Sequence, residues 1–69
     1  MSNPRYIVGY KEGNIAKETN FMTWEISSIF FEELVRDPNV ERVIFKKKRW
    51  LGRGYKIIKS YERNNILMR

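Results

Sequence analysis

The chain has 69 residues, of which 42% are hydrophobic and 14% aromatic, and its formal net charge is +6. This composition contains too many core-forming side chains for a disordered chain, and the length predicts one domain over residues 1–69. Because cysteine and histidine are absent, disulfides, thiolate chemistry, histidine bases and most transition-metal sites are excluded. We therefore expect neither a cofactor nor a metal.

The charge is unevenly distributed along the chain. Residues 1–40 carry four cations and six anions, a net charge of −2. Residues 41–69 carry ten cations and two anions, a net charge of +8. A surface with such an excess attracts an acidic partner, which we expect to be nucleic acid or an acidic protein surface.

The sequence also indicates where the protein resides. No apolar run is long enough to cross a bilayer, and the N-terminus lacks the pattern of a signal peptide. We expect a cytoplasmic protein that binds neither a membrane nor a small-molecule substrate.

Two strands are predicted before the first helix. Residues 5–11 alternate between two faces and are rich in β-branched and aromatic side chains, which favours a strand. Glu12-Gly13-Asn14 is a turn cluster, and residues 15–21 alternate weakly, which predicts a shorter strand that completes a hairpin. The expected order of elements is therefore β-β-α-β-β, or β-α-β-β if residues 15–21 form no strand.

The clearest predicted element is a helix over residues 23–36. Thr23 is the expected N-cap, and Arg36 followed by Asp37-Pro38-Asn39 is expected to end the helix. Ser27 lies within the apolar arc, where a small side chain lets the helix approach a sheet and its hydroxyl can bond to the preceding turn. The arc expected to pack on an antiparallel sheet consists of Trp24, Ile26, Phe30, Phe31, Leu34 and Val35.

Ile29 departs from this helical pattern, because it projects among charged residues on the other side of the helix. It is either a single exposed apolar residue or a contact to a protein partner. That partner could be a second copy, since a domain near the lower size limit is often stabilised by forming a homodimer.

Two further strands are predicted over residues 40–50 and 54–63. They are joined by a loop whose glycines, Gly52 and Gly54, suit positive φ values. Strand alternation places Val43, Phe45 and Lys47 on one face of the third strand. In the fourth strand it places Tyr55, Ile57 and Tyr61 on one face and Lys56, Ile58 and Ser60 on the other.

Residues 64–69 could extend the sheet, cap the core or fray. The predicted fold class is α+β, with three to four antiparallel strands and one amphipathic helix on one face.

Catalytic chemistry finds little support in the sequence. A nucleophile paired with a histidine base is impossible without histidine. Glu25 and Glu32 are two helical turns apart on the expected outer face, where carboxylates are usually solvated, and no glycine-rich loop precedes a helix as in phosphate-binding motifs. We expect a protein that is not an enzyme and has no catalytic or metal-binding residues.

Residues 46–56, KKKRWLGRGYK, form the candidate binding site. Alternation places Lys46 and Lys48 on one face and Lys47 on the other, so the end of the hairpin is basic on both sides. If this end projects beyond the core, its cations can neutralise phosphates, and Trp50 or Tyr55 can stack on bases. The predicted site for nucleic acid or another polyanion consists of Lys46, Lys47, Lys48, Arg49, Trp50, Arg53, Tyr55 and Lys56.

Two classes of function remain open from the sequence. The first is a small non-enzymatic basic module that binds nucleic acid through the hairpin. The second is a small protein-binding modulator or inhibitor, of the phage or mobile-element accessory type, that acts on an acidic protein surface. A simpler interpretation of the lysines is that they discourage edge-to-edge association of the sheet.

Overall fold

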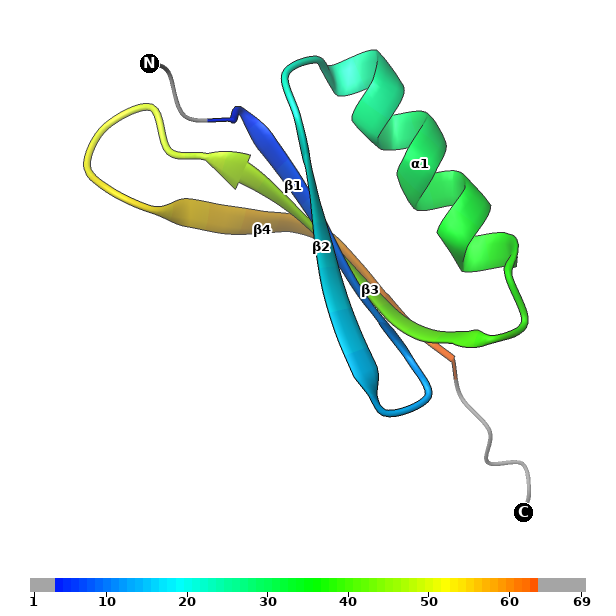
Figure 1. Cartoon of the computed structure of the whole chain (residues 1–69). Coiled ribbons are helices and arrows are strands. Elements are labelled where there is room, and N and C mark those ends of the chain that lie inside the picture. Colours follow the sequence, from blue (N-terminus) through cyan, green and yellow to red (C-terminus); the bar gives the residue numbers. More distant parts are fainter. Residues whose placement is uncertain (1–3, 64–69) are drawn as a thin grey trace.

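Four antiparallel strands form one sheet, and one helix packs on one face of it (Figure 1). This computed structural model describes residues 4–63, and the alternatives considered for residues 64–69 lie outside the described residues. The predicted α+β class and the β-β-α-β-β order are confirmed. The elements are β1 (Tyr6–Glu12), β2 (Ile15–Phe21), α1 (Trp24–Arg36), β3 (Val40–Lys48) and β4 (Tyr55–Glu62).

The strand order across the sheet is β2-β1-β3-β4, so β1 and β3 are central. β1 and β2 form a hairpin in which Glu12 pairs with Ile15 around the two-residue loop Gly13-Asn14. Gly13 has a φ of +63°, while Asn14 has a negative φ, which is the pattern of a type II′ turn with glycine first. The chain then crosses over β1 through α1 and returns as β3, which pairs with β1 along its length.

Local sequence accounts for the bounds of α1. The Thr23 hydroxyl accepts a hydrogen bond from the Ile26 amide at 3.4 Å, and the Asp37 amide donates to the Leu34 carbonyl at 3.1 Å after the last turn. Ser27 is fully buried, and its hydroxyl donates to the carbonyls of Thr23 and Trp24 at 2.8 and 3.0 Å. Both the predicted N-cap and the predicted role of Ser27 are confirmed.

The core lies between α1 and the two central strands. Phe45 is completely buried at its centre, where its ring stacks on those of Trp24 and Phe31 at centroid distances of 5.2 and 5.6 Å. The other buried apolar side chains are those of Val8, Phe31, Leu34, Val40 and Val43.

The prediction that Ile26 packs on the sheet is wrong, because its side chain is 58% exposed. The residues of α1 closest to the sheet are Ser27, Phe31 and Leu34, which follow one another at helical spacing. Ile26 lies beside this row, on the flank of the helix, and therefore stays exposed. Trp24 lies at the end of the buried row and is 46% exposed, although one face of its ring covers Phe45.

Two β-bulges set which apolar residues face the helix. In β3, Glu12 pairs with Val40 and Lys11 with Arg42, so the intervening Glu41 is the extra residue. In β4, Lys46 pairs with Ile57 and Phe45 with Lys59, so Ile58 is the extra residue. Each bulge lets two residues three apart reach the core, namely Val40 with Val43 and Ile58 with Tyr61.

The bulge in β4 corrects the predicted faces of that strand. Ile58 packs against the core together with Tyr61, whereas Ile57 is 59% exposed and lies opposite Lys46. Simple alternation placed Ile57 with Tyr61 and is wrong, because a bulge shifts the period of two by one residue.

Candidate nucleic-acid interface

The β3–β4 hairpin extends past the end of the region that α1 covers, with its loop far from the β1–β2 turn (Figure 1). The nine residues of β3 span about 30 Å, whereas the 13 residues of α1 span about 20 Å. The loop closes with a hydrogen bond from the Arg49 amide to the Gly54 carbonyl at 3.1 Å. Gly52 and Gly54 have φ values of +86° and +83°, as expected from the sequence. The hairpin therefore carries its tip into solvent.

Four cations on or next to β3 and β4 have partners within the protein. Three ion pairs join Arg42 to Glu62 at 3.2 Å, Lys46 to Glu18 at 3.2 Å and Lys59 to Glu32 at 3.7 Å. The Arg63 guanidinium donates to the carbonyls of Asp37 and Val40 at 2.9 and 3.3 Å, which ties the end of β4 to the loop before β3. These four cations are therefore engaged in contacts within the described part of the chain.

The cations of the distal hairpin are different. Within residues 4–63, their side chains make no ion pair or hydrogen bond, and the sequence over residues 46–56 contains no acidic residue. All of them are exposed. They are Lys47, Lys48, Arg49, Arg53 and Lys56. The positive charge of the hairpin is therefore not compensated by the described part of the chain.

Two predicted site residues have structural contacts. Lys46 is held by Glu18, which reduces the charge that it presents to a ligand. The Tyr55 hydroxyl donates to the Pro4 carbonyl at 2.7 Å, and its ring is partly buried. Trp50, by contrast, is 92% exposed. Of the two predicted stacking residues, Trp50 is the one whose ring is open to a ligand.

The structure gathers most of the predicted residues around one hollow at the base of the loop. Its volume is about 240 Å³. It is lined by Lys47, Lys48, Arg49, Trp50, Leu51 and Lys56. Arg53 lies beyond it, in the loop itself.

Three residues that sequence reasoning missed lie beside the hairpin. A second hollow, of about 550 Å³, shares Lys47, Lys48, Arg49 and Trp50 with the first and adds Arg5, Tyr6 and Met22. We call this second hollow the aromatic cleft. Tyr6 is the neighbour of Lys47 in the β1–β3 ladder, and the Lys48 amide donates to the Arg5 carbonyl at 2.8 Å. No local sequence pattern indicates this proximity, because it depends on pairing between distant strands.

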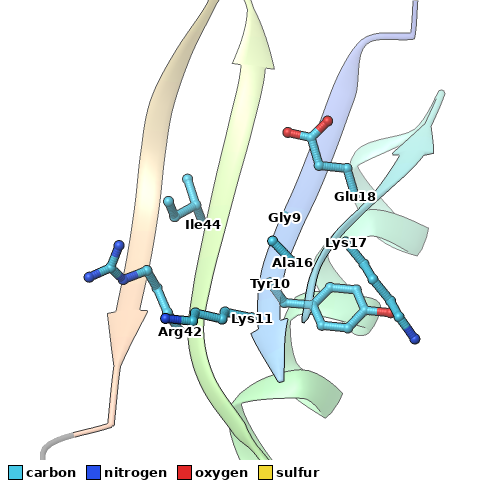
Figure 2. Close-up of a pocket in the computed structure, with 8 residues that line it drawn as sticks. All are labelled: Gly9, Tyr10, Lys11, Ala16, Lys17, Glu18, Arg42 and Ile44. Carbon is cyan, nitrogen blue, oxygen red and sulfur yellow. The ribbon is translucent and has the colours of Figure 1, made fainter. Parts of the chain in front are cut away.

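Another hollow, of about 520 Å³, lies on the face of the sheet away from α1 (Figure 2). Gly9 and Ala16 contribute almost no side chain to it. Figure 2 shows Lys11 and Arg42 near one another at one end, with Glu18 toward the other. Because this hollow mixes both signs of charge, and because its one aromatic residue, Tyr10, packs on Phe30, it suits a polyanion less well than the hairpin does.

The outer side of α1 carries exposed apolar side chains. Ile29 is 59% exposed, in agreement with its predicted place outside the buried arc. Ile26, at 58%, lies one turn before it, so the two form an exposed apolar pair. Such an exposed apolar pair suits contact with another protein.

Comparisons with known proteins found no matching family model and no match among curated proteins or solved structures. Function is therefore inferred from the geometry of the molecule. In residues 4–63, no helix is long and apolar enough to span a membrane. Over the same range, no three acidic side chains are grouped so that they could hold a metal ion.

Proposed function

We propose that this protein is a small, non-enzymatic binding module that holds nucleic acid through its β3–β4 hairpin. The observation that carries the proposal is the concentration of exposed cations on the projecting hairpin. Four other cations, Arg42, Lys46, Lys59 and Arg63, contact acidic or carbonyl groups, whereas the five on the hairpin lie together over residues 47–56, with no acidic residue among them and no side-chain partner within residues 4–63. A phosphate backbone supplies the missing negative charge along a line, which matches an elongated hairpin.

Electrostatic repulsion within the hairpin supports the same proposal. Lys47 and Lys56 are directly opposite one another in the β3–β4 ladder. Like charges in this arrangement destabilise a sheet, and a bound phosphate relieves the repulsion. The exposed Trp50 supports a nucleic-acid ligand in particular, because its open ring offers a surface on which a base can stack.

The test is a binding titration with single-stranded DNA, duplex DNA and RNA at several salt concentrations, followed by fluorescence anisotropy. If five cations each contact a phosphate, the log–log slope of affinity against salt should reach about −3.5 on single strands and about −4.5 on duplex DNA. Absence of binding to all three ligands at low salt would disprove the proposal.

A charge-reversal variant locates the site. The double substitution Lys48→Glu and Arg53→Glu should weaken binding to every sequence alike and make the salt slope shallower. The matched control is the double substitution Lys11→Glu and Lys17→Glu, because Lys11 and Lys17 are exposed on β1 and β2 and lie outside both hairpin hollows. Equal loss in both variants would mean that net charge, and not the hairpin, determines binding.

A second candidate function is a protein-binding modulator or inhibitor, of phage or mobile-element accessory type, that acts on an acidic protein surface. The exposed pair Ile26 and Ile29 favours it, because an apolar pair beside charged residues suits a protein contact. If the partner is a second copy, sedimentation should show a homodimer at micromolar concentration, and Ile29→Lys should shift it to monomer. A strictly monomeric protein would exclude the homodimer.

We propose a cytoplasmic location for the protein, since nucleic acid is accessible there. Its partner in this proposal is nucleic acid, and neither a membrane nor a small-molecule substrate is involved. Cell fractionation with an antibody against the native protein tests the location.

A further inference from the structure

We propose that the aromatic cleft takes one unpaired nucleobase, so that the protein binds single-stranded nucleic acid in preference to duplex. This inference rests on the proposed function, because it adds a base site to a hairpin that holds phosphates. The cleft combines the two kinds of group that an unpaired nucleotide requires. Arg5, Lys47, Lys48 and Arg49 supply positive charge, and Tyr6, Met22 and Trp50 supply apolar or aromatic surface.

No acidic residue lines the aromatic cleft. Its volume of about 550 Å³ falls in the range of sites that bind small organic groups. The hollow on the face of the sheet away from α1 has a similar volume. It includes the acidic Glu18, however, and its one aromatic ring, that of Tyr10, already packs on Phe30. The combination of positive charge and open aromatic surface therefore distinguishes the aromatic cleft from that hollow.

The Tyr6 side of the cleft is held in place by the core. The Tyr6 ring lies 6.0 Å from the Trp24 ring and 5.9 Å from the Phe45 ring, between centroids. The Arg5 amide donates to the Phe21 carbonyl at 3.1 Å, and the Arg5 carbonyl accepts from the Lys48 amide at 2.8 Å. Because this wall is fixed before a ligand arrives, ordering it upon binding costs little entropy.

The Trp50 side of the cleft is open. With 92% of its surface exposed, the Trp50 side chain is free to close on a base that rests near Tyr6. A base within a duplex is stacked and paired on both sides and cannot enter between these groups, whereas an unpaired base can. Met22, which is 53% exposed, offers an adaptable apolar contact to the edge of the base.

The test compares a short single strand with the same strand in which the internal nucleotides are abasic. The two probes carry equal numbers of phosphates, so a difference in affinity reports contacts to bases. The intact strand should bind about fivefold to 150-fold more tightly, which is the usual effect of one stacked base. DNA and RNA versions of both probes identify which sugar the site accepts.

Two variants test whether the difference in affinity between the intact and abasic strands arises in the aromatic cleft. Trp50→Ala should remove most of the preference for the intact strand over the abasic strand. Because Trp50 is 92% exposed, this substitution removes no packing from the core. Leu51→Ala is the matched control, because Leu51 is an exposed apolar residue in the same loop that does not line the aromatic cleft. It should retain the preference. A second readout uses the variant Trp24→Phe, in which Trp50 is the remaining tryptophan. The intact strand should quench its fluorescence, and the abasic strand should not.

The outcomes separate this inference from the proposed function. Equal, salt-dependent binding of the intact and abasic strands would overturn the base site and leave phosphate binding by the hairpin intact. Equal loss of preference in Trp50→Ala and Leu51→Ala would also overturn it. If no probe binds at low salt, both the proposed function and this inference are wrong.

Discussion

Lys47 and Lys56 are directly opposite one another on β3 and β4. Neither side chain has a partner of opposite charge within residues 4–63. On the same face, Tyr6 and Phe21 continue this row across β1 and β2, so the row passes from aromatic to basic. The transition marks where the structural part of the sheet ends and the proposed binding part begins.

Removing this repulsion should stabilise the free protein. We expect Lys56→Glu to raise the free energy of unfolding by about 0.2–1 kcal/mol, because it replaces a like-charge pair with an opposite-charge pair. Thermal melts should show the gain most clearly at low salt, where charges are less screened. The same variant should bind nucleic acid more weakly, and a loss of stability in it would contradict the repulsion argument. Lys17→Glu, whose neighbour on β1 is Tyr10, serves as the control.

Truncation of Phe45 and of Ile26 should have very different effects on stability. Phe45→Ala should destabilise the fold by about 3–5 kcal/mol, because it removes the ring on which Trp24 and Phe31 stack. Ile26→Ala should change stability by no more than about 0.5 kcal/mol, because Ile26 is mostly exposed. Urea denaturation measures both, and similar losses in the two variants would show that the buried row of α1 is misplaced.

Ser27 should tolerate removal of its hydroxyl but not added volume. In Ser27→Ala the Thr23 carbonyl keeps its hydrogen bond from the Ser27 backbone amide, and alanine favours the helix, so we expect little change in stability. Ser27→Leu should cost about 1–3 kcal/mol, because the site is completely buried against the sheet. Melting temperatures of the two variants test this prediction. If Ser27→Leu were as stable as the wild type, α1 would have to be able to move away from the sheet.

The Tyr55 hydroxyl should matter for stability and not for binding. Tyr55→Phe deletes the hydrogen bond to the Pro4 carbonyl while keeping the ring, and it should cost about 0.5–1.5 kcal/mol. Because the ring is retained, nucleic-acid affinity should stay close to that of the wild type. Urea denaturation and anisotropy on the same preparation test both expectations. A large loss of affinity with unchanged stability would instead make the hydroxyl a ligand contact.

Part of this molecule follows from neighbouring residues alone. Thr23 caps the start of α1, Gly13 shapes the first turn, and Gly52 and Gly54 shape the long loop. These features could be predicted because capping and backbone conformation depend on residues within a few positions of one another. The concentration of cations over residues 46–56 was likewise visible in the sequence.

Other features required the tertiary structure, because they depend on the strand order and register. Alternation along β4 could not show the bulge that turns Ile58 inward and leaves Ile57 exposed. The pairing of Lys46 with Glu18 joins strands on either side of β1. The pairing of β1 with β3 places Tyr6 beside Lys47, and this contact forms part of the aromatic cleft. Contacts of this kind join residues far apart in the chain, whose proximity is set by burial of the whole sheet against α1 and not by any local pattern.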